Sequence, residues 1–206
     1  MKKTKPLSEA KSLSGKILDF IKPFVERAEI AGSIRRARPH CNDIDIVCIP
    51  KRVENRDLLG DVVASRNLLW EMLKEKTSAP LPSIFWESGG EVEGKQCVLW
   101  LHRAQMQLDL WFATPETFAT RLLCRTGSMQ HNIWLASRAK RLGWKWNPYE
   151  GILKGGQWRK VGDAEVYDGG HLNSAETEHE LYALLELPFI EPKNREQDWL
   201  VKNFGQ

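Results

Sequence analysis

The feature that most constrains the fold is a short run in which carboxylates alternate with branched apolar residues, Asn42-Asp43-Ile44-Asp45-Ile46-Val47. Side chains alternate across a β-strand, so this run predicts a strand with Asp43 and Asp45 on one face and apolar side chains entering a core from the other. Carboxylates about 7 Å apart on one face repel each other unless a cation lies between them, and Mg²⁺ prefers such oxygen ligands. A solvated strand end is the plainer interpretation of Asp-x-Asp taken alone.

A third carboxylate lies in a similar run, Gln107-Leu108-Asp109-Leu110-Trp111. Alternation places Gln107, Asp109 and Trp111 on one face of a strand. If this strand neighbours the first one, three carboxylates converge and could hold two metal ions. One ion would lower the pKa of an attacking hydroxyl and the other would hold a triphosphate, as in-line phosphoryl transfer requires.

A third motif, Gly32-Ser33-Ile34-Arg35-Arg36, begins eleven residues before Asp43. It combines a glycine that permits close backbone approach, a hydroxyl, and two arginines at an expected helix N-terminus. Exposed backbone N–H groups there favour phosphate, and an arginine can hold phosphate oxygens bidentately. Without the aspartates, an ordinary turn with solvated charges would be the simpler interpretation.

The pattern of apolar residues and breakers predicts an α+β fold. In the first part it predicts helices at Ser8–Val25, capped by Ser8, and Arg66–Lys76, with strands at Ala28–Ala31, Ile44–Ile49, Ile84–Glu87, Gln96–His102 and Gln107–Phe112. In the second part it predicts helices at Glu116–Cys124, Met129–Leu142 (capped by Ser128) and Ala175–Leu185, with a hairpin within residues 144–170. We therefore expect a catalytic subdomain over residues 1–115, with a mixed sheet and helices on one side, and a small α/β subdomain over residues 116–206.

Composition narrows the class of protein. No apolar run approaches the ~20 residues that span a bilayer, so we expect an intracellular, cytoplasmic monomer that does not bind membranes. The four cysteines lack the spacing of a zinc site or a disulfide framework, which favours free thiols.

Charge is unevenly distributed along the chain. The net charge is only +3, yet residues 117–160 carry nine lysines and arginines against one acid, which leaves −5 for the rest. This imbalance suggests a face for a polyanion, with DNA contacts expected from Arg138, Lys140, Arg141 and Lys145. Tryptophans interleaved with these residues could stack on bases, although at least half of them are expected to be core.

Taken together, these motifs resemble the signature of the family X DNA polymerases, the group that includes DNA polymerase beta and terminal transferase. The resemblance rests on Gly32-Ser33-x-Arg35-Arg36, Asp43-Ile44-Asp45-Ile46, Leu108-Asp109-Leu110, Thr126-Gly127-Ser128 with His131-Asn132, Lys145-Trp146-Asn147-Pro148-Tyr149, and the segment from Glu178 to Glu196. They occur in the family's order over nearly the whole chain. The resemblance implies a nucleotidyltransferase palm followed by a subdomain that binds the incoming nucleotide.

The resemblance also implies roles for single residues. Asp43, Asp45 and Asp109 would bind two Mg²⁺ ions, with Mn²⁺ as a substitute, and Asp109 would also activate the primer 3′-hydroxyl. Gly32, Ser33 and Arg36 would hold the β- and γ-phosphates. Gly127 and Ser128 would line the sugar and Asn132 would reach the base. Asn42 stands where the family has a glycine before the first aspartate, and it joins the residues expected at the nucleotide.

Departures from the family pattern set further expectations. Cys124-Arg125 replaces an aromatic pair beside the sugar, Ala136 replaces an arginine on the template side, and Gln107 and Trp111 replace arginines around Asp109. About thirty residues precede Gly32, so a minimal form without the amino-terminal lyase region is expected.

The expected function is therefore template-directed addition of dNTPs to primer-template or gapped DNA, in short-gap filling or repair and with low fidelity. A template-independent enzyme, or one that nucleotidylates small molecules or RNA ends, is the alternative. A non-catalytic nucleic-acid-binding module would leave the three carboxylates unexplained.

Overall fold

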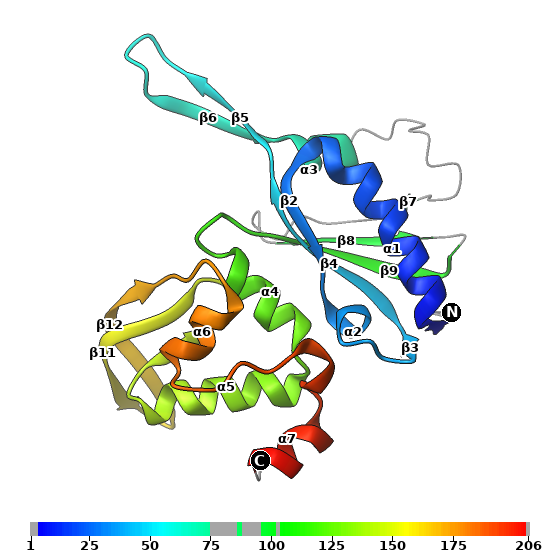
Figure 1. The fold of residues 1–206 in the computed structure, drawn as a ribbon. Helices are drawn as coiled ribbons and strands as arrows, with labels where there is room; N and C mark the ends of the chain where they lie inside the picture. The colour runs from blue at the N-terminus through cyan, green and yellow to red at the C-terminus, as the bar shows by residue number, and fades with distance from the viewer. Residues whose placement is uncertain (1–3, 75–85, 88–95, 102–103, 205–206) are drawn as a thin grey trace. The chain divides into compact units, whose positions relative to one another are not determined.

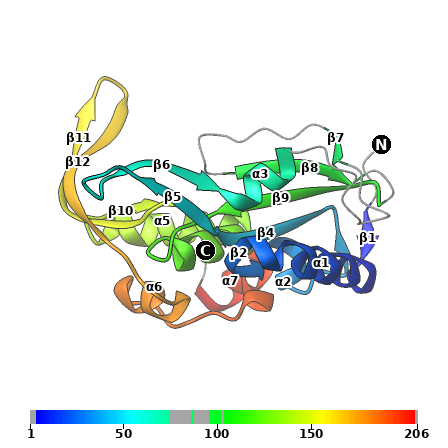
Figure 2. The same ribbon diagram turned by 90° about the horizontal axis from the view of Figure 1, so that it is seen from above.

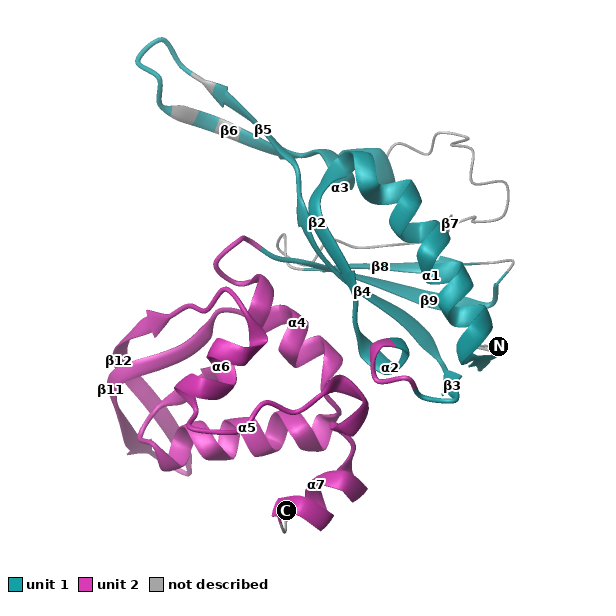
Figure 3. Ribbon diagram, in the orientation of Figure 1, with its two compact units in different colours: residues 1–34, 38–113 teal, residues 35–37, 114–206 magenta. Residues whose placement is uncertain are grey.

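The computed structural model describes residues 4–74, 86–87, 96–101 and 104–204. The chain divides into two compact units, residues 1–34 with 38–113 and residues 35–37 with 114–206 (Figure 3). The sequence placed a boundary after residue 115, and the catalytic and nucleotide-binding roles assigned to the two parts stay predictions. Among the described residues, no helix combines the length and the apolar character that crossing a membrane requires.

The first unit is built on a five-stranded sheet with the order β2-β4-β9-β8-β7 (Figures 1 and 2). Its strands are β2 (Val25–Ile30), β4 (Asp43–Pro50), β9 (Met106–Phe112), β8 (Gln96–Leu101) and β7 (Trp86–Glu87). The central strands β4 and β9 are parallel, whereas the other neighbours are antiparallel. The sheet is therefore mixed, and the α+β class expected from the sequence is confirmed.

Apolar residues on one face of this sheet pack against two helices, α1 (Leu7–Ile21) and α3 (Leu68–Lys74) (Figure 1). The shared core includes Ile17 and Ile21 of α1, Leu69 and Leu73 of α3, and Ile44, Ile46, Leu108 and Leu110 of the central strands. Because side chains alternate along a strand, burial of these residues directs the intervening aspartates of β4 and β9 to the opposite face.

Shorter elements complete the first unit. Strands β1 (Lys5–Pro6) and β3 (His40–Cys41) pair with each other, and α2 (Gly32–Arg35) follows β2. The antiparallel ribbon of β5 (Arg52–Arg56) and β6 (Val62–Asn67) extends away from the sheet (Figure 1).

The helix predicted over Arg66–Lys76 is wrong at its start. Residues Val62–Asn67 form β6, and α3 begins only at Leu68. The reason is local, because the side chain of Asn67 accepts a hydrogen bond from Trp70 N at 3.0 Å and so caps the helix. Residues 75, 76, 84, 85 and 102, at the ends of three predicted elements, lie outside the described residues.

The first predicted helix also differs from the observed one. It begins at Leu7 after Pro6, which makes no side-chain cap, so the prediction that Ser8 caps it is wrong. It ends at Ile21, and Pro23 lies in a 3₁₀ turn, Lys22–Phe24, because proline cannot donate the hydrogen bond that would continue the helix.

The second unit combines helices with a three-stranded antiparallel sheet. Its elements are α4 (Phe118–Thr126), α5 (Met129–Arg141), β10 (Lys145–Asn147), β11 (Gly151–Val161), β12 (Ala164–Asn173), α6 (Glu178–Leu184), a 3₁₀ turn (Pro192–Asn194) and α7 (Gln197–Phe204). Its core includes Trp134, Leu135, Trp146 and Leu181. Two of the interleaved tryptophans are therefore core residues, as expected.

Capping sets two helix starts in this unit. Ser128 accepts a hydrogen bond from His131 N at 3.1 Å, which confirms the predicted cap of α5. Thr177 accepts one from Glu180 N at 3.2 Å, so α6 begins at Glu178 rather than at Ala175. Strand β10 and helix α7 were not predicted.

Candidate active site

The three predicted metal ligands lie on the same face of two neighbouring strands. In the parallel pair of β4 and β9, Asp45 is directly opposite Asp109 and Asp43 is directly opposite Gln107. Asp43 and Asp45 are half-buried, whereas Asp109 is buried, with only 9% of its surface exposed. The condition set by the sequence, that the two strands should be neighbours, is therefore met within the first unit.

Two uncharged side chains on β9 donate hydrogen bonds to these aspartates. Gln107 Nε2 donates to Asp109 Oδ1 at 2.7 Å, and Trp111 Nε1 donates to Asp45 Oδ1 at 3.0 Å. The sequence placed both residues on the same face as Asp109 and identified them as replacements for arginines. Their alternation with Asp109 was the signal that they share its face, but the contact of Trp111 with Asp45 depends on how the strands pair.

The carboxylates are not drawn together into a ligand cluster. Among the residues that the structure describes, no group of three or more His, Cys, Asp or Glu side chains has an arrangement that could hold a metal ion. The chemistry and register of the donors nevertheless suit a hard divalent cation, because Asp43, Asp45 and Asp109 supply oxygen ligands from one face. The metal site stays a prediction.

The Gly-Ser turn lies against the second of these aspartates. Gly32 has a φ of +59°, and a Cβ added to it would lie 2.1 Å from Asp45 Oδ2. Ala31 N also donates to the backbone oxygen of Asp45 at 2.8 Å. The neighbouring Ser33 Oγ is buried and has no hydrogen-bond partner among the described residues. The turn therefore lies against Asp45 at Gly32, and a contact of the Ser33 hydroxyl with phosphate stays a prediction.

Helix α2 corrects one detail of the predicted phosphate cradle. Gly32 and Ser33 begin this helix and Arg35 ends it, so the arginines are not at its N-terminus. Asn42, also expected at the nucleotide, accepts a hydrogen bond from Thr4 Oγ1 at 2.8 Å through its side-chain oxygen.

Arg36 belongs to the second unit and is bound by protein acceptors there. Its Nε donates to Glu196 Oε1 at 2.7 Å, and its Nη1 donates to Thr126 O at 2.5 Å and to Gly127 O at 3.3 Å. These contacts tie Arg36 to the Thr126-Gly127 segment that the sequence assigned to the sugar. Its predicted contact with phosphate stays a prediction.

The segment after α4 explains why position 127 is a glycine. A Cβ there would lie 2.3 Å from His131 Nδ1 and 2.9 Å from Asn132 Oδ1. Asn132 Nδ2 donates to Cys124 O at 2.8 Å, while its Oδ1 is buried with no partner among the described residues. The side-chain amide of Asn132 is therefore held in one orientation, in which Oδ1 can still accept a hydrogen bond.

The residues that depart from the family pattern also lie in this unit. Cys124 is buried in its core, and the guanidinium of Arg125 lies over the ring of Tyr149 at 5.6 Å. Ala136 packs at the edge of the same core. Arg125 is therefore held by an aromatic ring of its own unit, and the effect of these positions on sugar and base selection stays a prediction.

A buried ionic network was missed by the sequence analysis. Glu178 accepts both guanidinium branches of Arg35, at 2.9 Å and 2.6 Å, and a further bond from Arg195 Nη1 at 2.7 Å. Burial alone would raise the pKa of Glu178, but the two arginines outweigh burial and lower it. A signal was present, because Glu178, Leu181, Tyr182 and Leu185 follow helical spacing on one face.

A second buried pair lies beside this network. His131 Nε2 and the Tyr182 hydroxyl are 2.6 Å apart. Burial, together with the positive charge of Arg195, lowers the pKa of His131 to about 3, so the imidazole is neutral at ordinary pH.

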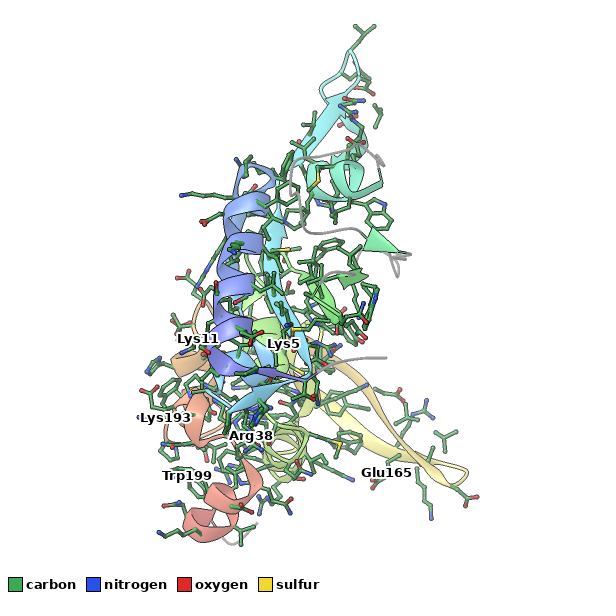
Figure 4. The ribbon with its side chains drawn as sticks, turned by 90° about the vertical axis from the view of Figure 1, so that its right-hand side faces the viewer. Lys5, Lys11, Arg38, Glu165, Lys193 and Trp199 are labelled. Atoms are coloured by element: carbon green, nitrogen blue, oxygen red, sulfur yellow. The ribbon has the colours of Figure 1, made fainter. Side chains whose placement is uncertain are left out.

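Two of the four predicted DNA-binding residues are engaged within the second unit. Arg138 donates to Leu185 O at 2.8 Å and to Glu186 at 2.6 Å. Lys140 forms an ion pair with Glu165, a residue of the β11–β12 hairpin that is labelled in Figure 4. Arg141 and Lys145 form no ion pair with another residue that the structure describes. Acids outside residues 117–160 thus offset part of the charge excess counted along the sequence.

The chain resembles known proteins in sequence. Residues 121–196, within the second unit, match the family described as DNA polymerase beta thumb. The chain is also similar to the protein named DNA polymerase/3′-5′ exonuclease PolX of Bacillus subtilis (strain 168), with 24% identity over 203 residues. That alignment covers 97% of this chain but only 30% of the relative, so the chain spans less than a third of that protein's length.

Proposed function

Because this chain is related to the family X DNA polymerases, we propose that it is a nucleotidyltransferase that adds dNTPs to the 3′ end of a DNA primer opposite a template. The observation that carries the proposal is the placement of Asp45 directly opposite Asp109, with the Gly32 backbone so close to Asp45 that an added Cβ would lie 2.1 Å from its Oδ2. This arrangement supports a site in which the carboxylates of one sheet face would bind divalent ions and the adjoining turn would bind phosphate.

Each residue of this face has a proposed task. Asp43, Asp45 and Asp109 would hold two Mg²⁺ ions, which supply a hydroxyl of lowered pKa and neutralise charge on the triphosphate. Asp109, the most buried of the three, would accept the proton of the primer 3′-hydroxyl. Ser33 Oγ, which lacks a partner among the described residues, would donate to a phosphate oxygen beside the Gly32 backbone.

The second unit would bind the incoming nucleotide. Gly127 and Ser128 would line the sugar, and Asn132 would approach the base with its amide already oriented by Cys124 O. Loose selection of sugar and base would follow from Cys124 and Ala136, because a polymerase rejects ribonucleotides and mispairs through bulk and contacts that these residues do not offer. Short-gap filling in repair suits such an enzyme.

Primer extension tests the proposal. The purified 206-residue chain is assayed with Mg²⁺ or Mn²⁺ on gapped, open-template and single-stranded DNA and on an RNA end, with dNTPs and rNTPs in parallel. We expect addition of the complementary dNTP, strongest on a templated primer. Extension of single strands alone would favour a template-independent enzyme, and no transfer to any nucleic acid would refute the proposal.

Asp109→Ala is the matching variant. It should abolish nucleotide transfer while the protein stays folded, since removal of a repelling carboxylate costs little stability. Asp163→Ala, which removes an exposed aspartate in the turn of the β11–β12 hairpin, is the control and should retain the parent rate. An Asp109→Ala protein with the parent rate would contradict the assignment of this face.

A further inference from the structure

We infer that Arg36 and Glu196 are positioning residues, which hold the Thr126-Gly127 segment in place for the sugar of the incoming nucleotide. The inference rests on the proposed function, in which Gly127 lines that sugar. It replaces the phosphate contact that the sequence predicts for Arg36, and it assigns a role to Glu196, for which none was expected. All four residues belong to the second unit.

Arg36 binds the backbone of this segment at two consecutive carbonyl groups. Its Nη1 donates to Thr126 O at 2.5 Å and to Gly127 O at 3.3 Å. Thr126 is the last residue of α4 and Gly127 follows it as the C-terminal cap, where carbonyl groups have no donor within the helix. Arg36 supplies the missing donor and so fixes the short connection between α4 and α5.

Glu196 determines the direction in which Arg36 points. Its Oε1 accepts from Arg36 Nε at 2.7 Å, and the side chains of Arg36 and Glu196 are only 15% and 27% exposed, so the bond is partly shielded from water. The guanidinium is planar with its donors in fixed directions, so an acceptor at Nε sets where Nη1 points. The ion pair also offsets the positive charge of Arg36 and so weakens its attraction for phosphate.

The neighbouring arginine holds the same segment through a side chain. Arg35 Nη1 donates to Thr126 Oγ1 at 2.7 Å, while Glu178 accepts both branches of the same guanidinium. Thr126 is fully buried, whereas Gly127 is partly exposed. Thr126 is therefore fixed through its carbonyl by Arg36 and through its hydroxyl by Arg35, which leaves Gly127 as the part of the segment that a ligand can reach.

This fixed backbone has a consequence for nucleotide binding. A segment that is already held loses less conformational entropy when a ligand binds to it. Without Arg36 or Glu196, the nucleotide itself would have to order the Thr126-Gly127 connection, so binding of its nucleoside part should weaken. The contacts of the triphosphate, which the proposed function assigns to Ser33 and the metal ions, would be unaffected.

Inorganic triphosphate distinguishes a sugar-positioning role from a phosphate contact, because it competes with a dNTP for phosphate contacts but has no sugar. Single-turnover primer extension at a fixed concentration of free Mg²⁺ gives the Kd of the complementary dNTP and the inhibition constant of inorganic triphosphate, for the parent, Arg36→Met and Glu196→Ala. Each variant should weaken dNTP binding about tenfold, the size of one lost hydrogen bond, and leave the inhibition constant within about twofold of the parent value. The double variant should be no weaker than Arg36→Met, because Glu196 acts through Arg36.

Glu29→Ala is the matched control. Glu29 accepts two hydrogen bonds from Arg27 on β2 of the first unit, at 3.1 Å and 2.5 Å, so its loss removes an arginine–glutamate pair that does not contact the nucleotide segment. Both constants should stay at the parent values. Thermal unfolding of each variant identifies a merely structural role, which would lower Tm and the fraction of active protein but leave the dNTP Kd of that fraction unchanged. Glu196→Ala keeps the inference testable if Arg36→Met does not fold.

The outcomes separate the inference from the proposed function. If the parent extends primers and either folded variant has a dNTP Kd within about twofold of the parent value, the positioning role is refuted while the polymerase activity stands. It is refuted as well if Arg36→Met weakens dNTP and inorganic triphosphate by the same factor, or if Glu196→Ala tightens both, because Arg36 would then be a phosphate ligand that Glu196 restrains. A parent protein that extends no primer refutes the proposed function, and the inference fails with it.

Discussion

Gly32→Ala should damage catalysis more than stability, because the added methyl group points at Asp45. The new Cβ would lie 2.1 Å from Asp45 Oδ2 and 2.9 Å from its Cγ. Ordinary contact begins at 3.4 Å, so the turn and the carboxylate must separate by about 1.3 Å. A misplacement of about 1 Å at a reacting centre costs on the order of 100-fold in rate.

Backbone strain accompanies this displacement and has to be separated from it. Gly32 has a φ of +59°, where an alanine costs roughly 1–2 kcal/mol. Gly162→Ala is the matched control, because Gly162 has a φ of +61° and nothing within 4 Å of an added Cβ. For a chain of this size each kcal/mol lowers Tm by about 2–4 °C, so both variants should lose a few degrees.

The assay pairs thermal unfolding with single-turnover primer extension. Gly162→Ala should extend at the parent rate, whereas Gly32→Ala should extend about 100-fold more slowly at a temperature where both are folded. Equal rates for the two variants would refute the reasoning, because the turn would then not constrain the carboxylate of Asp45.

Two further predictions concern the second unit. His131 has a pKa of about 3 in the folded protein and 6.5 in the unfolded chain. Between these values the unfolded chain binds the proton and the folded protein does not, so the free energy of unfolding falls as the pH drops from 6.5 towards 3. The fall is at most about 1.4 kcal/mol per pH unit. Thermal melts of the parent and His131→Gln between pH 7 and 4.5 check this, and parallel curves would contradict it. Replacing Arg141 and Lys145 with Ala should make the plot of log binding constant for DNA against log salt concentration less steep, by about 0.9 for each lost phosphate contact. Replacing Arg138 and Lys140 should change this slope less. If the slope is unchanged when Arg141 and Lys145 are replaced, the duplex binds elsewhere.

The sequence by itself determined the local features of this protein. The alternation of aspartate with isoleucine and leucine fixed which face of β4 and β9 joins the apolar core of α1 and α3, because successive side chains of a strand point to opposite faces. Ser128 set the start of α5, since a cap involves only residues within one turn. Where local signals competed, as at Asn67, the predicted helix of residues 66–76 began too early.

Only the tertiary structure decided which residues meet. The three aspartates share a face because β4 and β9 pair in parallel with Asp45 opposite Asp109, and a shift by one residue would have separated them. The same register brings Trp111 to Asp45, 66 residues away, and folding of the second unit brings Arg35 to Glu178 across 143 residues. Periodicity assigns a residue to a face, but partners so distant along the chain are chosen by the packing of whole elements, which no local pattern encodes.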